Sequence, residues 1–225
     1  MSEPAIHAVG LEKAYFGQPA LDPLDIVVPE SQRITLIGHN GSGKTTLLKI
    51  LAGTLESTGG GATVAGHPIG SPDARAAVSF LTDQPVFYDD LTVWEHLEYV
   101  ARLHHTVEWE QHAVDLLDRL GIAERSDDLP ATFSRGLKQK AAIALAFVRP
   151  FDVVLVDEPF VGLDRAGRAA LLDLFDDIHA EGATLVVATH ELSSADRADR
   201  LLALREGALI YDGPPDSADV ADLVS

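Results

Sequence analysis

Short runs of apolar residues, many of them β-branched, recur along the chain, and several are continuous rather than alternating with polar residues. Continuous apolar runs are typical of strands in a parallel sheet, because both faces of such a sheet are covered by other elements. The pattern therefore predicts buried strands at residues 26–28, 34–37, 78–81, 153–156 and 185–187.

Apolar positions spaced by three and four residues lie between these runs and predict amphipathic helices. One such pattern starts at Trp109 and ends before the stop signal Gly121, and another starts at Leu137 and ends before Pro150. A third helix is predicted near residues 171–178, and residues 201–211 are predicted to form a hairpin that turns at Glu206-Gly207.

The order of these elements predicts an α/β fold. A strand, a glycine-rich loop and a helix come first, further strands follow, and a helix-rich stretch at about 88–148 precedes the last strands. With 225 residues the chain is long enough for one full core, so we predict a single domain over 1–225 with a helical subdomain inserted at about 88–148.

Charge and composition narrow the possible partners. The formal net charge of −18 would repel nucleic acids and anionic lipid surfaces, so we expect no nucleic-acid partner and no direct lipid binding. The sequence has no cysteine, no apolar run long enough to span a membrane and no signal-peptide pattern at its start. These features predict a cytoplasmic protein whose contact with a membrane would pass through a protein partner.

The segment that follows the predicted strand at 34–37 matches the phosphate-binding pattern G-x-x-x-x-G-K-[ST] and opens the next helix. In this pattern backbone N–H groups surround a phosphate, Lys44 supplies a positive charge, and the Thr45 hydroxyl is a ligand for Mg²⁺. The sequence therefore predicts a site for a nucleoside triphosphate and Mg²⁺, formed by Gly38, His39, Asn40, Gly41, Ser42, Gly43, Lys44, Thr45 and Thr46.

A second signal is the apolar run at 153–156, which ends in Asp157 and Glu158. Phosphoryl transfer needs a metal ligand and a group that holds the attacking water. We predict that Asp157 is the Mg²⁺ partner and that Glu158 is the general base or the water-orienting group. Two acidic residues at the end of a strand are a weak signal alone and a strong one beside a phosphate loop.

Together with further landmarks in family order, these motifs resemble the ATP-binding subunit of an ABC transporter over almost the whole chain. The resemblance implies a mixed sheet, an N-terminal antiparallel β subdomain and an inserted α-helical subdomain. The additional landmarks are Tyr15, Gln84, the signature-like segment 133–140, Gly162-Leu163-Asp164 and His190.

The resemblance also implies a role for each landmark. Tyr15 would stack on adenine, although its neighbour Phe16 could take that role. Gln84 would touch Mg²⁺ and water, and His190 would contact the terminal phosphate. Ser134 and Gly136 would grip the γ-phosphate of an ATP molecule held by a second subunit. Each residue also has an ordinary structural explanation. Gln84 and His190 could be polar residues at strand ends, Tyr15 could be a packing residue, and Ser134 could simply cap a helix.

The implied function is ATP hydrolysis in a head-to-tail dimer that drives integral membrane subunits, at the inner face of the cell membrane. Arg135 and Leu137 depart from the common signature and resemble exporter variants, so we expect export. The aromatic and apolar residues after Gln84 are either a docking face for the membrane subunits or part of the core of the helical lobe; they are Phe87, Tyr88, Leu91 and Trp94.

We also considered two other functions. The chain could be a soluble ATPase that acts in assembly or regulation without a membrane partner. A phosphate-loop kinase is disfavoured, because it would need a binding site for the acceptor substrate and would not explain the signature segment or His190.

Overall fold

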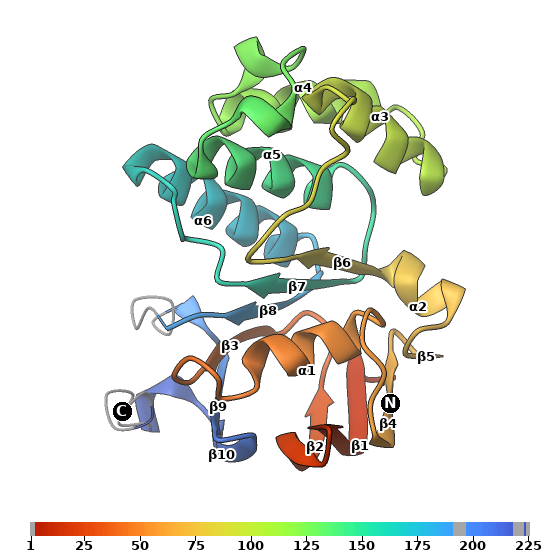
Figure 1. Cartoon of the computed structure of the whole chain (residues 1–225), viewed down its shortest axis with the longest axis vertical. Helices are drawn as coiled ribbons and strands as arrows, with labels where there is room; N and C mark the ends of the chain where they lie inside the picture. The colour runs from red at the N-terminus through yellow and green to blue at the C-terminus, as the bar shows by residue number, and fades with distance from the viewer. Residues whose placement is uncertain (1–2, 191–196, 218–222, 224–225) are drawn as a thin grey trace. The chain divides into compact units, whose positions relative to one another are not determined.

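The computed structural model describes residues 3–190, 197–217 and 223 (Figure 1). The chain divides into two compact units. The first is built from 1–80, 151–158 and 179–225, and the second from 81–150 and 159–178. The chain passes from the first unit into the second between Phe80 and Leu81 and again between Glu158 and Pro159.

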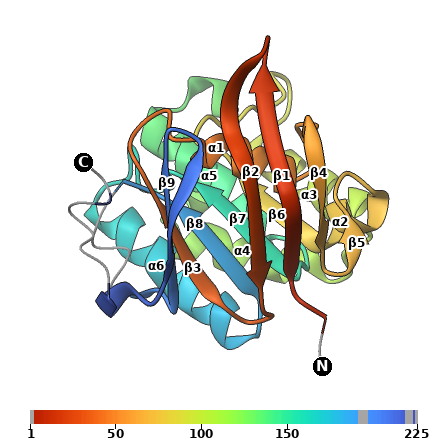
Figure 2. The same ribbon diagram turned by 90° about the horizontal axis from the view of Figure 1, so that it is seen from below.

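One sheet of the first unit is antiparallel and has four strands in the order β2-β1-β4-β5. Figure 2 shows β1 and β2 as long neighbouring strands that meet at a tight hairpin. Phe16 and Gly17 form its turn, and both have positive φ, as two-residue hairpin turns favour. This sheet confirms the antiparallel β part that the resemblance implied. Its strands are β1 (Ile6–Tyr15), β2 (Gln18–Val28), β4 (Gly59–Val64) and β5 (His67–Pro68).

The second sheet has the strand order β10-β9-β3-β8-β7-β6. Strand β3 pairs in parallel with β8 and β9, β7 pairs in parallel with β8, and β10 runs antiparallel to β9. The predicted strand at 26–28 is the end of β2 in the antiparallel sheet, where Val27 is exposed, so it is not covered on both faces as predicted. The other predicted strands lie in the second sheet, the C-terminal hairpin is confirmed, and this sheet is mixed as expected. Its strands are β3 (Arg33–Ile37), β6 (Val78–Leu81), β7 (Val153–Asp157), β8 (Thr184–Ala188), β9 (Arg200–Arg205) and β10 (Ala208–Gly213).

Burial explains why these strands have continuous apolar sequences. Every residue of β3, β7 and β8 is buried. Apolar side chains of both sheets and of α1 (Lys44–Leu51) form one core, to which Ile6, Leu36 and Leu48 contribute. The first unit also contains α2 (Pro72–Ala77) and the short 3-10 helix η4 (Pro215–Ser217).

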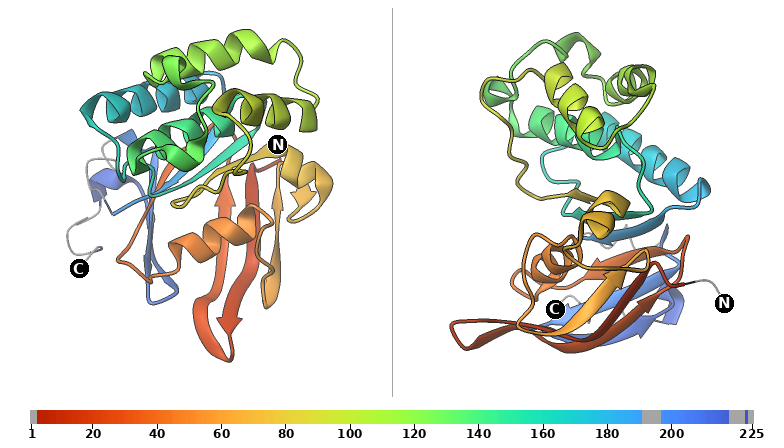
Figure 3. Two further views of the ribbon diagram at one scale, coloured as in Figure 1. Left: turned by 45° about the horizontal axis from the view of Figure 1, so that its top comes forward. Right: turned by 90° about the vertical axis from the view of Figure 1, so that its right-hand side faces the viewer.

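The second unit is helical, and its helices lie against one another in both views of Figure 3, coloured olive through green to cyan. The predicted helices are confirmed as α4 (Trp109–Arg119), α5 (Arg135–Phe147) and α6 (Arg165–Ala180). Phe147 of α5 and Phe175 of α6 meet edge to face, with ring centroids 6.3 Å apart. The remaining elements are α3 (Val93–Leu103) and the 3-10 helices η1 (Ala123–Arg125) and η2 (Pro130–Thr132).

Helix α3 starts with a complete capping box. The Thr92 hydroxyl accepts a hydrogen bond from the Glu95 N–H, and the Glu95 carboxylate accepts one from the Thr92 N–H. This reciprocal pair satisfies two of the N–H groups that a helix start leaves without partners. Among the described helices, none combines the length and the apolar character that a bilayer crossing requires.

Candidate active site

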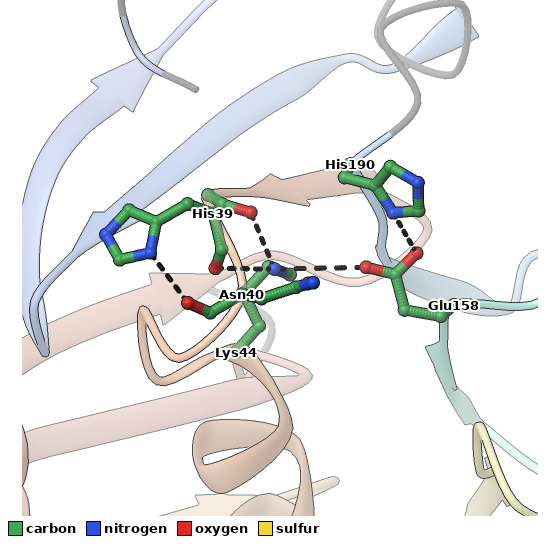
Figure 4. Close-up of polar contacts among 6 residues, drawn as sticks. His39, Asn40, Lys44, Glu158 and His190 are labelled. Atoms are coloured by element: carbon green, nitrogen blue, oxygen red, sulfur yellow. Dashed lines mark hydrogen bonds and ion pairs between the residues drawn. The ribbon is translucent and has the colours of Figure 1, made fainter. Parts of the chain in front are cut away.

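The strand order β3-β8-β7 brings together residues that are far apart in the sequence. The phosphate loop follows β3, His190 lies just after β8, and Asp157 and Glu158 stand at the end of β7. Because these three strands are parallel neighbours, their carboxyl ends share one edge of the sheet. Figure 4 shows Lys44, Glu158 and His190 meeting at this edge.

The ammonium group of Lys44 is enclosed by acceptors of the first unit. Lys44 Nζ donates to the carbonyl oxygens of Gly38 at 2.6 Å and His39 at 3.2 Å, and it lies 3.9 Å from Glu158 Oε1. Only 6% of the Lys44 side chain is exposed, and this burial lowers its pKa below the ordinary value. The negative charges of Glu158 and Asp157 act in the opposite direction. Lys44 is therefore a positive charge with little competing solvent, suited to binding phosphate oxygens.

Glu158 lies between this cation and an imidazole. Its Oε2 lies 2.8 Å from His190 Nδ1, and its side chain is only 17% exposed, whereas that of His190 is 54% exposed. The backbone of Glu158 has φ of 47°, which is unusual for a residue with a side chain. Its N–H donates to the Ala188 carbonyl at 2.9 Å, so β8 fixes the carboxylate beside His190. A carboxylate held in this way can accept a proton from a nearby water molecule.

The phosphate loop forms its own turn before α1 begins. The Ser42 N–H donates to the His39 carbonyl at 3.1 Å, and His39 Nδ1 lies 2.8 Å from the Asn40 carbonyl oxygen (Figure 4). Helix α1 starts directly after Gly43, whose φ is 107°, and no side chain caps this helix start. The start of α1 can therefore present backbone N–H groups to an anion, together with the positive end of the helix dipole.

The donor set for Mg²⁺ is small and consists of oxygen atoms. Asp157 is fully buried at the end of β7, and Thr45 is half-buried in the first turn of α1. A hydroxyl and a carboxylate suit Mg²⁺, which commonly binds one or two protein ligands together with substrate phosphates and water. Within the described ranges, no group of three or more His, Asp or Glu side chains could hold a metal ion without such help. The residues present therefore fit Mg²⁺ bound with a nucleotide.

Tyr15 also belongs to the first unit. It is the last residue of β1, and 43% of it is exposed, so its ring offers a surface to a planar ligand. The ammonium group of Lys13 lies 5.2 Å from the centre of this ring and donates to the Glu56 carbonyl at 2.6 Å. Phe16 projects fully into solvent at the hairpin turn, whereas Tyr15 is partly packed, and this difference favours Tyr15 as the adenine shelf.

The second unit contains three of the predicted site residues, Gln84, Ser134 and Gly136. Gln84 is exposed, and its Nε2 lies 3.4 Å from Asp83 Oδ2. The Ser134 hydroxyl accepts from the Leu137 N–H at 3.4 Å and caps α5, which confirms the capping role and leaves open any role toward ATP. A Cβ atom at Gly136 would collide with the Gly162 carbonyl oxygen, so this position needs glycine.

Contacts between α5 and the segment after Pro159 were not predicted. The buried Gln139 donates through Nε2 to the Pro159 carbonyl at 3.3 Å, and Lys140 Nζ lies 3.5 Å from Asp164 Oδ1. The side chain of Arg135 runs beside Gly162. Residues 135, 136, 139 and 140 share one face of α5, but this spacing does not indicate which segment the face contacts.

The candidate docking residues divide by exposure. Tyr88 is 55% exposed, while Phe87, Leu91 and Trp94 are partly buried. His96 was not singled out from the sequence and turns out to organise this region. Its Nε2 accepts a hydrogen bond from the Tyr88 N–H at 2.9 Å, and its Nδ1 lies 2.7 Å from the Thr92 carbonyl oxygen. Of the four predicted residues, Tyr88 therefore offers the largest free surface.

A family model described as ABC transporter matches residues 21–161. An uncharacterized ABC transporter ATP-binding protein of Synechocystis is 34% identical over 199 residues, which cover 86% of this chain and 56% of the relative. The Escherichia coli protein YbhF, named a "Probable multidrug ABC transporter ATP-binding protein", is 34% identical over 221 residues, which cover 96% of this chain and 38% of YbhF. The chain therefore spans about half or less of the length of these two relatives.

A solved structure titled "Structure of ATP binding subunit of ABC transporter" has the same fold. It matches with a TM-score of 0.92 and 30% sequence identity, and the match covers 97% of each chain. The family model covers well over half of the present chain. From the shared motifs, the family model and this solved subunit together, we conclude that the chain belongs to the ABC transporter ATP-binding family, whose members are ATPases.

Proposed function

We propose that this chain is the ATP-hydrolysing motor subunit of an ABC exporter, acting as one ATPase domain with a helical subdomain at about 88–148. The observation that carries the proposal is the position of Glu158 between Lys44 and His190, at the edge where the ends of β3, β8 and β7 meet. This arrangement supplies a cation for phosphate, a base for water and an imidazole beside both.

The proposed roles follow from these contacts. Lys44 and the N–H groups of the phosphate loop bind the outer phosphates of ATP, and the His190 ring contacts the terminal one. Glu158 orients the attacking water and takes its proton as the water oxygen bonds to the γ-phosphorus, while the bond from that phosphorus to the bridging oxygen breaks and ADP leaves. Thr45 and Asp157, with Gln84, would hold Mg²⁺, which neutralises phosphate charge when bound. Tyr15 carries the adenine ring.

We further propose a head-to-tail dimer around two ATP molecules. Ser134 and Gly136 lie at the start of α5, where backbone N–H groups and the helix dipole favour an anion. They would meet the γ-phosphate of ATP bound to a second ABC ATPase subunit, identical or different. Loss of that phosphate removes these contacts, so the dimer opens and integral membrane subunits receive the movement.

Export is supported by two observations. The name of YbhF includes multidrug transport, and Arg135 and Leu137 stand at the signature positions that resemble exporter variants. Tyr88 and its neighbours are the proposed contact for the membrane subunits, which would place the chain in the cytoplasm at the inner face of the cell membrane. The net charge of −18 disfavours direct binding to nucleic acid or lipid.

Two experiments test this proposal. Purified protein should hydrolyse ATP only with Mg²⁺ present, measured by phosphate release, and a protein that releases no phosphate would refute the ATPase assignment. Tagged protein should also retain integral membrane proteins when purified from detergent-solubilised membranes. The Tyr88→Ala variant should retain fewer of them, while the exposed Val114→Ala variant on α4 serves as control. Unchanged retention with Tyr88→Ala would remove this docking face.

A further inference from the structure

The turn between β9 and β10 is bonded to the phosphate loop, although the two are far apart in the sequence. Gly207 lies in this turn, and its N–H donates to the Ser42 carbonyl at 3.0 Å. The Gly207 carbonyl accepts from the Asp22 N–H of β2, also at 3.0 Å. Both polar backbone groups of one residue therefore join the phosphate loop to the antiparallel sheet.

The backbones of these segments are packed closely. A Cβ atom at Gly207 would lie 3.3 Å from the carbonyl carbon and oxygen of Ala20. A Cβ atom at Gly43 would lie 2.9 Å from the same Ala20 oxygen, and one at Gly38 would collide with the Leu204 carbonyl oxygen. The hairpin and the start of β2 therefore form a wall behind the phosphate loop, in which backbone atoms approach one another closely.

This wall leaves the phosphate loop little freedom. Ser42 and Gly207 are both buried, so their hydrogen bond is shielded from water. The Ser42 carbonyl belongs to the residue that also donates to His39 within the loop turn. A shift of the hairpin would therefore move Ser42, and with it the backbone N–H groups that surround phosphate in the proposed function.

We propose that Gly207 is a positioning residue for nucleotide binding and that the β9–β10 turn is a structural part of the phosphate site. The inference rests on the proposed binding of ATP at the phosphate loop. Gly207 touches neither phosphate nor Mg²⁺ and acts through Ser42.

The Gly207→Ala variant tests this role against a matched control. Gly207 has φ of 88° and Gly182 has φ of 99°, so alanine introduces similar backbone strain at either position. Gly182 lies in the first unit, in the turn between α6 and β8, where its added Cβ would lie 3.5 Å from Ser31 Oγ. The two variants therefore differ in what the new methyl group meets.

The readouts are the Kd for ADP by titration calorimetry and the KM and kcat for ATP. Gly207→Ala should weaken ADP binding about three- to tenfold, since one hydrogen bond and its alignment are disturbed. It should raise KM more than it lowers kcat, because the loop holds phosphate before and during the reaction. Gly182→Ala should change the Kd by less than about twofold. Equal Kd values for the two variants would overturn the inference.

Amide hydrogen exchange in the unaltered chain tests the same link without a substitution. ADP should slow exchange in residues 39–45 and also in 204–208, while 180–184 keeps its rate. Slowing confined to 39–45 would overturn the inference and leave nucleotide binding intact. An unaltered chain that binds no ADP would refute the proposed function, and this inference with it.

Discussion

Replacing Glu158 by glutamine should separate nucleotide binding from hydrolysis. Glutamine has the same shape as glutamate and can keep a hydrogen bond to His190, but it is a poor proton acceptor at neutral pH. The lost function is the assistance of a positioned base, which contributes about 10²- to 10⁴-fold to a rate. At about 1.4 kcal/mol for each factor of ten, the barrier should rise by about 3 to 5.5 kcal/mol.

The same substitution should leave the affinity for ATP unchanged or increase it. Glu158 Oε1 lies 3.9 Å from Lys44 Nζ, so at an effective dielectric constant of about 20 their attraction is no more than about 4 kcal/mol. Glutamine removes this attraction and also a negative charge from the proposed phosphate site. Lys44 is then more available to phosphate, and we expect an ATP affinity equal to that of the parent protein or higher.

The assay combines single-turnover phosphate release with calorimetric titration of ATP. Glu181→Gln is the matched control, because Glu181 is an exposed residue of the first unit and its replacement removes the same charge. The control should hydrolyse ATP at the parent rate. A Glu158→Gln protein that also keeps the parent rate would show that another group activates the water.

Three further predictions concern other residues. Lys44→Ala should weaken ADP binding by about 10- to 150-fold, since a charged hydrogen bond contributes about 1.5–3 kcal/mol; calorimetry that shows an unchanged Kd would contradict this role. Phe175→Ala should destabilise the second unit by about 3–5 kcal/mol in urea, because its buried ring packs on Phe147. Tryptophan fluorescence can report this unfolding, and a loss below about 1 kcal/mol would contradict it. The pKa of Asp164 lies below its ordinary value, because the carboxylate accepts a hydrogen bond from the Gly167 N–H and lies near a lysine. Its stabilisation is present above that ordinary value and is lost as pH falls through the lowered pKa, so Asp164→Asn should lower Tm at pH 7 with a difference that shrinks in acid. A difference that does not depend on pH would contradict this assignment.

The sequence predicted the central strands well because burial on both faces leaves continuous apolar runs, as in β3, β7 and β8. Three strands of the other sheet were not located individually: β1, β4 and the two-residue β5. Strand β1 changes register between Ala8 and Leu11, where Gly10 has positive φ, and this irregularity breaks its alternation. Strand β4 begins with Gly59, Gly60 and Gly61, which have no side chains to form a pattern.

The site was predictable in its residue types but not in its contacts. The phosphate-loop pattern identified Lys44, the acidic pair at the end of a strand identified Glu158, and the family resemblance identified His190. Their convergence depends on the strand order, which places β8 between β3 and β7. The bond from Gly207 to Ser42 depends only on backbone atoms and has no signature in side-chain chemistry. Contacts of this kind become visible only when the fold is known.

The pairing of β3 has a consequence for how the polypeptide is made. Arg33 pairs with Leu185 and Ile34 pairs with Arg200, so both neighbours of this strand are synthesised roughly 150 residues later. At about 5–20 residues per second, a ribosome needs about 8–30 s to produce that length. During this time the nascent β3 is an apolar segment without its partner strands. The phosphate loop that follows it also lacks its contact with the β9–β10 turn. Competence to hold nucleotide must therefore wait until β8 and β9 have been synthesised and have paired with β3.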